Sequence, residues 1–550
     1  MRLRRSVVAT TATALALLAS ACGGSPGTQS SEGAVKDGGQ IIIRGCTPQN
    51  PLIGTMTGEV CGGWIVDWTS SRLVHYNTTT SAPENDVAES IKTDDSTTFT
   101  VTLKKGRTFS DGTEIKAKNF VEAWNIGAYG PNGHENSHFF EPIAGYDDLQ
   151  CGTTADGQTD CATAPPKAKQ LSGLVIKDDY TFTITTSSPT SNLPIRLGYS
   201  AFMPQPDSYL ANPSDEAYGK KPVASGAYQV INNTATEIVL QKNTKYNGPH
   251  PGHVDKLIYR IYNDPNAAFT DVVANNIDFT DVIPTDQLAG DAWKAQVGEG
   301  RWLTREAGII EVLTFSPADD QLKNNPALRK AISRAIDRET ITKQIFNGTR
   351  TPAQGWVSPV ADGYRAGACG DSCTYAKDQA KQAYEAAGGY RGQFTISVNQ
   401  DGGHKAWADA VCNNLKNNLG MDCVVNQTPN FRTLLNQAKA GELKGAFRNG
   451  WQMDYPSIEN FLTPIYAKGA GSNYSRYHNP TFEAKLKEAA AAKELSQANA
   501  AYQQAEAMLG QDFPTAPLWL RVQPGVYSNK ITHVQYNAFG VPDIAGISVK

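Results

Sequence analysis

The sequence predicts a mixed α/β protein with at least two lobes, and three observations lead to this prediction. Segments with the two-residue alternation of half-buried strands are interleaved with segments that have the apolar spacing of helices. After an export segment and a tether, about 510 of the 550 residues remain, which is more than one hydrophobic core supports. No internal repeat with the period of a solenoid protein is visible.

The chain begins with a predicted export signal over residues 1–21. A basic start is followed by an apolar run over residues 7–18, which is too short to span a bilayer. Small residues precede Cys22, and a Gly/Ser-rich tether covers residues 22–39. This arrangement resembles the bacterial lipoprotein pattern, which implies a lipid on Cys22. A plain signal peptide is the alternative, and it would leave Cys22 as an odd free thiol.

Alternation of residue type predicts strands. In residues 98–103, Phe99, Val101 and Leu103 point to one face and the threonines between them point to the other. The same pattern recurs at residues 180–184 and 238–240.

Apolar spacing predicts two long helical segments. The first starts at Pro326, because proline suits the first position of a helix, and continues through Ile345. The second starts at Pro480 and continues towards Leu509, with room for one break.

The eight cysteines after Cys22 lie as close neighbours in the sequence. Export places them in an oxidising compartment, where an even number indicates disulfides. Four local bonds are the economical choice, although the sequence does not determine connectivity: Cys46–Cys61, Cys151–Cys161, Cys369–Cys373 and Cys412–Cys423. The last four cysteines could instead bind zinc, but their C-x3-C spacing is loose for such a site.

Composition argues against some classes of partner. The formal net charge is −4 and the pI is about 6.1, and no basic run occurs after the signal. Nucleic acid is therefore not an expected partner. No later segment is apolar enough to cross a membrane, so we expect the only anchor to be at the amino end.

Several sequence blocks occur in a specific order from about residue 40 to residue 550. They cover residues 88–91, 99–106, 109–113, 117–124, 225–228, 325–338, 450–455 and 517–519. Their order and spacing resemble the extracellular solute-binding proteins of family 5, the oligopeptide, dipeptide and nickel receptors of ABC importers. The tether and the local cysteines are similar to those of actinobacterial members.

The resemblance implies a two-lobed, class II periplasmic-binding-protein-like α/β fold that closes around a ligand. Two chain crossings would form the hinge, and an extra subdomain would extend lobe I. The boundaries that follow from the blocks are residues 40–66, 193–268 and 510–550 for lobe I, 67–192 for the subdomain and 269–509 for lobe II.

The resemblance also implies a site for the free amino end of a peptide. Asp454 matches the aspartate that pairs with the peptide α-ammonium in oligopeptide receptors of this family. A charge pair inside a closing cleft fixes the register of the ligand. The alternative is that Asp454 only organises the turn before Pro456.

Other residues of the same block are expected to contact the peptide. The main chain from Asn449 through Gly450 to Gln452 would form one wall of an extended slot, with Trp451 as a stacking face. The predicted contacts also include Arg448 and Tyr455, together with Phe431, which stands where peptide receptors often have a tryptophan.

The opposite wall is expected around Glu59, Val60 and Cys61, which match the ligand-lining strand of lobe I. A peptide between the two walls would pair as an added strand.

One motif suggests an enzyme. Residues 134–138 spell H-E-x-x-H, in which His134 and His138 would bind zinc and Glu135 would act as the base. The Gly/Pro-rich stretch before it and Pro142 after it leave space for about two helical turns, and no third ligand occurs at the usual spacings. We therefore expect no enzymatic activity, no metal and no cofactor, and a secreted zinc peptidase is the less favoured alternative.

The resulting hypothesis is a monomeric, lipid-anchored receptor on the extracytoplasmic face of the cell membrane. It would capture short peptides and deliver them to the permease subunits of an ABC transporter. A receptor for a nickel chelate or an oligosaccharide on the same fold is the alternative.

Overall fold

The computed structural model describes residues 36–48, 50–152, 160–262, 264–400, 403–429 and 431–550. The predicted export signal, the lipidation site Cys22 and the first part of the tether lie outside these residues. Within the described part of the chain, no helix has the length and apolar character needed to cross a membrane.

A mixed sheet of eleven strands dominates the described residues, in the order β15-β14-β16-β12-β17-β11-β1-β10-β9-β8, with β13 paired to β17. β1 is parallel to β10 and β11, and β14 is parallel to β15 and β16, whereas the other pairs are antiparallel. The strands are β1 (Gln40–Gly45), β8 (Tyr228–Asn233), β9 (Glu237–Lys242), β10 (Lys256–Ile261), β11 (Phe279–Thr280), β12 (Trp302–Phe315), β13 (Arg350–Pro352), β14 (Gln393–Asn399), β15 (Asp422–Thr428), β16 (Ala446–Gln452) and β17 (Thr515–Tyr527).

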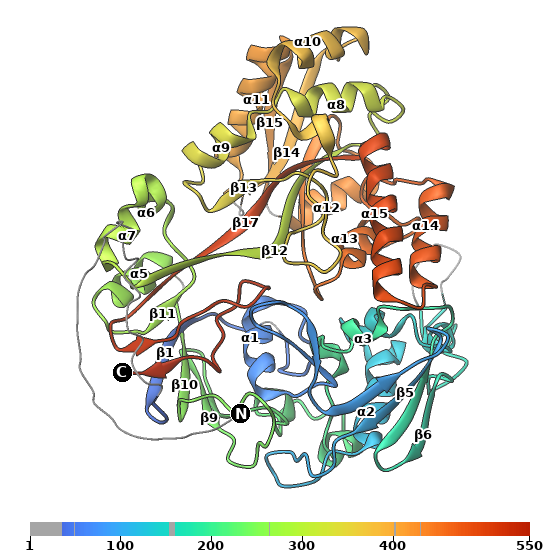
Figure 1. Ribbon diagram of the computed structural model, residues 1–550, viewed down its shortest axis with the longest axis vertical. Helices are drawn as coiled ribbons and strands as arrows, with labels where there is room; N and C mark the ends of the chain where they lie inside the picture. The colour runs from blue at the N-terminus through green and yellow to red at the C-terminus, as the bar shows by residue number, and fades with distance from the viewer. Residues whose placement is uncertain (1–35, 49, 153–159, 263, 401–402, 430) are drawn as a thin grey trace, which may run out of the picture. The chain divides into compact units, whose positions relative to one another are not determined.

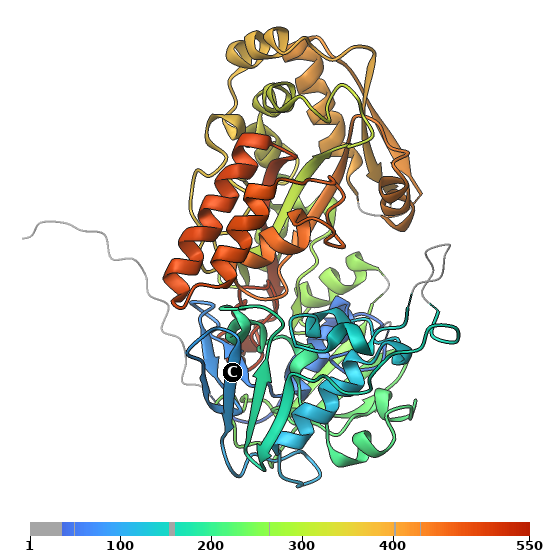
Figure 2. The same cartoon turned by 90° about the vertical axis from the view of Figure 1, so that its right-hand side faces the viewer.

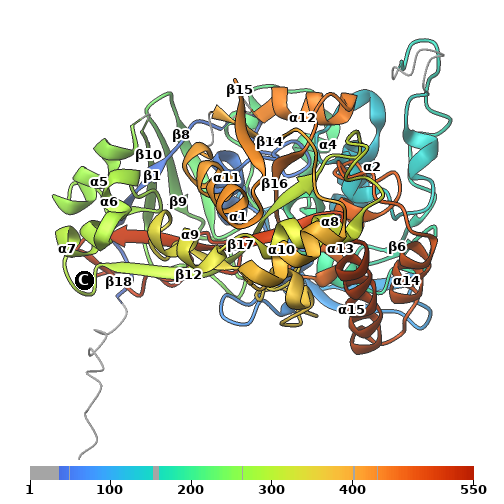
Figure 3. The same cartoon turned by 90° about the horizontal axis from the view of Figure 1, so that it is seen from above.

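The long strands β12 and β17 run side by side through the sheet, as Figures 1 and 3 show. Their pairing has register shifts between Glu306 and Ile310 and at Glu311. At one end, Trp302 and Val526 pack in a small apolar cluster with α5 and α7. At the other end, the two strands pack in the largest apolar cluster of the described residues. These two strands therefore connect separate cores.

A second sheet has the order β4-β5-β7-β6: β4 (Ala88–Lys92), β5 (Thr98–Leu103), β7 (Thr181–Thr185) and β6 (Leu174–Asp178). It packs against α2 (Ala117–Ala128) around an aromatic core that includes Trp124 and Phe182. The strands predicted at residues 98–103, 180–184 and 238–240 are confirmed, with Phe99 and Val101 buried. Two short pairs complete the strands: β2 (Val74–Tyr76) with β3 (Pro83–Asn85), and β18 (Ile531–Thr532) with β19 (Ser548–Val549).

The helices surround these sheets, and α14 and α15 lie side by side (Figures 1 and 2). The other α-helices are α1 (Val60–Thr69), α3 (Leu193–Arg196), α4 (Asp207–Ala211), α5 (Pro265–Val273), α6 (Thr285–Leu288), α7 (Ala292–Val297), α8 (Pro326–Arg334), α9 (Arg338–Gln344), α10 (Lys377–Ala386), α11 (Lys405–Leu419), α12 (Phe431–Ala440) and α13 (Ile458–Tyr466). Short 3-10 helices are η1 (Gly130–Asn132), η2 (Ser137–Phe140), η3 (Tyr146–Leu149), η4 (Ser200–Phe202), η5 (Tyr218–Lys220), η6 (Ala289–Asp291) and η7 (Gly370–Cys373).

The helix predicted from Pro326 through Ile345 is wrong as a single element, because the structure divides it into α8 and α9. Asp337 begins the second helix, since its side chain accepts a hydrogen bond from the Thr340 N–H at 3.0 Å. The second predicted segment is confirmed with its break, as α14 (Pro480–Ala490) and α15 (Leu495–Asp512).

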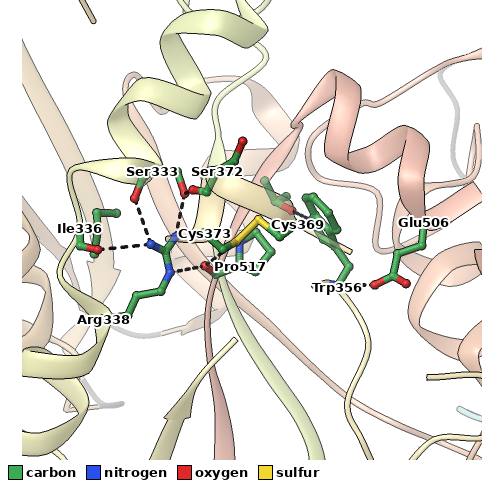
Figure 4. The surroundings of a disulfide bond; sticks show 10 residues. Ser333, Ile336, Arg338, Trp356, Cys369, Ser372, Cys373, Glu506 and Pro517 are labelled. Atoms are coloured by element: carbon green, nitrogen blue, oxygen red, sulfur yellow. Dashed lines mark hydrogen bonds between the residues drawn. A yellow bond between two sulfur atoms is a disulfide. The ribbon is translucent and has the colours of Figure 1, made fainter. Parts of the chain in front are cut away.

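All four disulfides of the economical pairing are present in the structure. Figure 4 shows the surroundings of the Cys369–Cys373 bond. Beside it, Arg338 is buried and donates to the carbonyl oxygens of Pro517, Ser333 and Ile336. Burial lowers the pKa of Arg338 to about 9.

The packing clusters bear on where the lobes divide. Residues 268–297 pack with Val526, and β11 pairs with β1, although the prediction assigns this stretch to lobe II. Residues 513–520 pack in the largest cluster with α8 and α11, although the prediction assigns them to lobe I. The predicted boundaries stay a prediction.

Candidate functional site

A cavity of about 360 Å³ lies where several distant segments of the chain meet. The start of α1 and the strand β2 with its following turn form part of the lining. Other lining residues include Tyr199, Tyr246 and His250, the residues just after β16, and the 537–543 loop. The volume is in the range of small-ligand sites.

Asp454 lines this cavity two residues after the end of β16. Its carboxylate accepts a hydrogen bond from Asn460 Nδ2 at 3.1 Å, and its backbone N–H donates to Asn460 Oδ1 at 2.9 Å. Burial raises the pKa of Asp454 to about 6, although the Asn460 hydrogen bond acts in the opposite direction. Among the described residues, no cationic side chain forms an ion pair with it. The carboxylate is therefore oriented by a neutral group and faces the cavity.

Two aromatic side chains stand next to this carboxylate. Burial chiefly, with the charge of Asp454 as a further contribution, raises the pKa of both Tyr76 and Tyr199. Tyr76 is held by a hydrogen bond from its hydroxyl to the carbonyl of Ile195 at 2.7 Å. The cavity thus combines a carboxylate with fixed aromatic walls.

A second cavity of about 150 Å³ lies along the earlier part of β16. Asn449, Gly450 and Trp451 line it from the strand, and Phe431 lines it from α12. The indole N–H of Trp451 donates to Asn460 Oδ1 at 3.0 Å, so one amide orients side chains at both cavities. β16 therefore connects the two cavities, and Gln452 lines the larger one.

One edge of β16 is open beside these cavities. The strand pairs with β12 from Ala446 to Gln452, whereas β14 pairs with it only at Ala446 and Phe447. Within the part of the chain that the structure describes, no strand pairs with residues 449–452 on the β14 side. Main-chain groups at such an edge can hydrogen-bond an extended peptide.

The predicted strand around Glu59 is wrong, because the helix α1 begins at Val60. The Glu59 carboxylate caps this helix, accepting from the N–H groups of Cys61 at 2.7 Å and Gly62 at 2.8 Å. Glu59 and Val60 line the larger cavity, but Cys61 does not and instead is bonded to Cys46. An added peptide strand cannot pair with this wall, since a helix has no free strand edge.

Two other predicted contacts lie outside both cavity linings. Tyr455 is buried in the core of the second sheet, and its hydroxyl donates to Glu459 Oε2 at 2.6 Å. The guanidinium of Arg448 lies 4.6 Å from the ring centre of Phe431. Core packing positions Tyr455 and aromatic stacking positions Arg448, and their predicted roles as ligand contacts stay predictions.

A buried ion pair lies behind Asp454. The Arg196 guanidinium contacts Glu459 Oε1 at 3.0 Å, and Asn192 Nδ2 donates to Glu459 Oε2 at 2.8 Å. Glu459 is only 2% exposed. The pair joins α3 to α13, and thus fixes the turn that carries the cavity carboxylate.

The H-E-x-x-H segment does not form the helix that zinc peptidase chemistry requires. His134 and Glu135 precede the short 3-10 helix η2, which contains His138. His134 Nδ1 bonds to Thr55 Oγ1 at 2.9 Å, and His138 Nδ1 contacts the Glu135 carbonyl at 3.2 Å. Across the described residues, no group of three or more His, Cys, Asp or Glu side chains is arranged to hold a metal ion.

Several lining residues were not predicted from the sequence. The lining residues Tyr199, His75, His250 and Asp543, and Asn460, which bonds to Asp454 from behind the lining, carry no motif and come from segments far apart in the chain. The one local signal is Asn460, which lies six residues after Asp454 at the start of α13. The others come together only through the tertiary fold.

An α/β fold with two cores connected by long strands, and with a cavity lined by distant segments, defines a two-lobed binding protein. The sequence profile described as "Bacterial extracellular solute-binding proteins, family 5 Middle" matches residues 82–473. The chain therefore belongs to the extracellular solute-binding proteins of family 5, whose members are binding proteins.

The chain is similar to the periplasmic oligopeptide-binding protein OppA of Haemophilus influenzae, with 25% identity over 453 residues, 78% of this chain and 79% of the relative. It superposes on the unliganded open form of the murein tripeptide binding protein MppA with a TM-score of 0.77, 21% identity, and coverage of 94% and 99%. It also superposes on the ABC transporter-associated protein DppA of Helicobacter pylori, solved with the peptide STSA, with a TM-score of 0.73, 18% identity, and coverage of 94% and 98%.

Proposed function

We propose that this protein is an extracytoplasmic receptor that binds short peptides and delivers them to an ABC transporter. The observation that carries the proposal is the Asp454 carboxylate, which faces a cavity without a cationic partner among the described residues. A peptide α-ammonium supplies the missing charge. The pair is formed in a partly desolvated cavity, where losing one partner costs about 2–5 kcal/mol.

The open edge of β16 provides the second part of the proposed binding mode. A peptide that lies along residues 449–452 pairs with main-chain groups, which every peptide offers regardless of sequence. Its amino end reaches Asp454, and a later side chain enters the smaller cavity beside Trp451 and Phe431. The similarity to an oligopeptide-binding relative supports this choice of ligand.

Closure of the two lobes is the proposed mechanism, with β12 and β17 as the hinge. The first of their register shifts, between Glu306 and Ile310, lies between the two cores that the strands connect, where a bend disturbs the least packing. We propose the boundaries given above, with two adjustments that the packing favours. Residues 268–297 then move with lobe I, and residues 513–520 move with lobe II.

The location and the partners complete the proposal. A lipid on Cys22 would hold the protein at the outer face of the cell membrane, where it would act as a monomer and present the closed, loaded form to permease subunits. Closure changes the surface offered to a partner, so that the permease can distinguish the loaded receptor from the empty one.

The test is calorimetric titration of the full chain with the tripeptide Ala-Ala-Ala and with its N-acetylated form. We expect the free peptide to bind and the acetylated peptide to bind at least about 30-fold more weakly. Asp454→Asn should weaken binding of the free peptide by a similar factor. Asp378→Asn, a change at an exposed carboxylate in α10, should leave affinity unchanged.

Equal binding of the two peptides, or an unchanged affinity in the Asp454 variant, would contradict the assignment of the peptide amino end. Mass spectrometry of the small molecules that copurify with the protein distinguishes the alternatives. Recovery of a nickel chelate or an oligosaccharide in place of peptides would favour the other receptors of this fold.

A further inference from the structure

Four charged side chains at the larger cavity form two ion pairs. Arg72 contacts Asp67 at 2.5 Å, and Arg107 contacts Asp86 at 2.8 Å. Asp67, Arg72 and Asp86 line the cavity, and Arg107 supports it from behind. These two carboxylates are neutralised within the protein, so they do not require a cation from the ligand.

Three more carboxylates line the same cavity. Glu59 is compensated by the N–H groups at the start of α1. Asp454 and Asp543 remain, and among the described residues neither forms an ion pair with a cationic side chain. Two carboxylates of the cavity therefore lack a contact ion pair, one more than the α-ammonium of a peptide can pair with, and the charges of Arg196 on Asp454 and of His250 and Arg305 on Asp543 act without such a contact.

The surroundings of Asp543 explain how its carboxylate is held without a cation. Burial raises its pKa, while hydrogen bonds from the Thr78 side chain and the Ala545 N–H and the charges of His250 and Arg305 act in the opposite direction. Arg305, whose charge acts on Asp543 without an ion-pair contact, donates instead to the carbonyl oxygens of Thr78, Thr79 and Tyr536. Asp543 is thus oriented by neutral groups, as Asp454 is by Asn460.

Two histidines lie next to Asp543 on the cavity wall. The rings of His75 and His250 contact each other in a tilted arrangement, with their centres 3.9 Å apart and an angle of 34° between their planes. Burial, with the charge of His250 as a further contribution, lowers the pKa of His75 to about 3, so His75 is neutral at physiological pH. His75 Nε2 is buried without a hydrogen-bond partner among the described residues, and no ion pair links His250 to Asp543 there.

The segment that starts at β2 connects the two carboxylates. Tyr76 lies beside Asp454, and Thr78, two residues later, bonds Asp543. Both acids line the same cavity of about 360 Å³, so one small ligand can contact both. Tyr76 and Phe539, whose ring centres are 5.5 Å apart, provide an apolar wall for the stem of a long side chain.

We propose that Asp543 forms a second cation-binding subsite of this cavity, and that the preferred ligands are peptides with a basic side chain near a free amino end. The α-ammonium pairs with Asp454, and the lysine ammonium or arginine guanidinium pairs with Asp543. The inference rests on the proposed peptide-binding function and specifies its substrate class. His75, which is neutral, provides a polar surface in the same cavity.

The test uses two tripeptides of nearly equal shape, Lys-Ala-Ala and norleucine-Ala-Ala, titrated into the full chain by calorimetry at pH 7. We expect the lysine peptide to bind at least about tenfold more tightly, because only its side chain carries the second charge. Asp543→Asn should remove this preference and leave the norleucine peptide unaffected. Asp454→Asn should weaken both peptides by the same factor, and Asp378→Asn should change neither.

Equal affinity of the unaltered protein for the two peptides would overturn the proposal without any variant, and would leave the peptide-binding function intact. A lysine preference that persists in a folded Asp543→Asn protein, checked by circular dichroism, would overturn it as well. If neither peptide binds and acetylation makes no difference, the proposed peptide-binding function itself fails.

Discussion

At the scale of single residues, Asn460 determines how the cavity carboxylate behaves. Its Oδ1 accepts from two N–H groups, the indole of Trp451 and the main chain of Asp454, which fixes the amide so that Nδ2 faces the carboxylate. Asn460 is 1% exposed, so water does not compete for these bonds. The Asp454 side chain is thus held in place by a neutral group and keeps its negative charge available. This arrangement suits a site that recognises a cation.

The pKa of Asp454 predicts how affinity depends on pH. Burial raises this pKa to about 6 in the ligand-free protein, and an ammonium binds only the ionised form. Affinity for Ala-Ala-Ala should therefore fall about tenfold for each pH unit below 6. It should also fall above about pH 8, where the peptide α-amine loses its proton.

Titration calorimetry from pH 4.5 to pH 9 measures this profile. Asp454→Asn should remove the acid limb and keep the alkaline one, because the ligand still titrates. An affinity that stays constant from pH 7 down to pH 5 would contradict the proposed charge pair.

Glu506 should make stability depend on pH. It is fully buried; its Oε1 accepts from the Trp356 N–H at 2.9 Å, and its Oε2 has no partner among the described residues (Figure 4). Burial raises its pKa from 4.5 to about 7. The protonated form is favoured in the fold, so this stabilisation is complete below about pH 4.5 and is lost as pH rises through 7.

Glu506→Gln should therefore reduce the pH dependence of the free energy of unfolding by about 1.4 kcal/mol per pH unit between pH 5 and pH 7. Urea unfolding at pH 5 and at pH 8 gives the comparison. The same substitution at Glu385, an exposed residue of α10, is the matched control and should have no such effect. The prediction is wrong if the free energy of unfolding of the Glu506 variant depends on pH in the same way as that of the unaltered protein.

At the scale of elements, the regular strands and helices follow from the sequence. The alternation at residues 98–103 predicts β5, because one face of that strand packs on a core and the other does not. The break at Asp337 also has a local signal, an aspartate three residues before Thr340, which the continuous apolar spacing hides. The strand predicted at the start of α1 is wrong, because Glu59 caps a helix there. The sequence does not reveal this role, since capping depends on main-chain groups that adopt helical geometry.

The candidate site is predictable only where it has a motif. The block around Gly450 and Asp454 does line the cavities, because it sits on one strand and the turn after it. Tyr455, next in the chain, turns into a core formed by residues more than two hundred positions away. His75 and Asp543 meet through the fold alone, so no local pattern identifies them.

The Cys46–Cys61 bond predicts an effect on both stability and binding. It links the end of β1 to the first turn of α1, next to the lining residues Glu59 and Val60. Replacing both cysteines with serine should lower the free energy of unfolding by about 3 kcal/mol. It should also weaken peptide binding, because the start of α1 loses its attachment to the sheet.

The Cys151–Cys161 bond is the matched control. It closes a loop of similar length and borders neither cavity. Its removal should cost a similar free energy of unfolding and leave affinity unchanged. Identical affinities in the two double variants would contradict the bracing role of the first bond.

At the scale of the whole molecule, the eleven-stranded sheet is continuous between cores that also touch through helices. The strands β12 and β17 connect the cores through the main chain. A second connection is made by Glu459, which pairs with Arg196 and accepts a hydrogen bond from Asn192. The Ser191 N–H also donates to the Ala490 carbonyl at 2.9 Å, beside the turn between α14 and α15. Any hinge motion must break these polar contacts while the strands stay paired.

Removing the ion pair should therefore increase opening. Arg196→Met leaves Glu459 buried without its cation, which should cost about 3–5 kcal/mol, whereas Arg196→Met with Glu459→Gln should cost less. Hydrogen exchange followed by mass spectrometry should show lost protection of the Ser191 amide in the double variant. Asp409→Asn, which removes the exposed Lys405–Asp409 pair, should leave that amide protected. Unchanged exchange at Ser191 in the double variant would contradict the role of this contact.

The closeness of Glu459 and Asn460 in sequence has a consequence for unloading. Glu459 pairs with Arg196 of α3, and Asn460 orients the Asp454 carboxylate, which is the proposed contact of the peptide α-ammonium. A movement that separates Arg196 from Glu459 would therefore also disturb the proposed contact between Asp454 and the peptide. If a membrane partner opens the two lobes when the receptor docks, the same movement would release the peptide. No separate release step would then be needed.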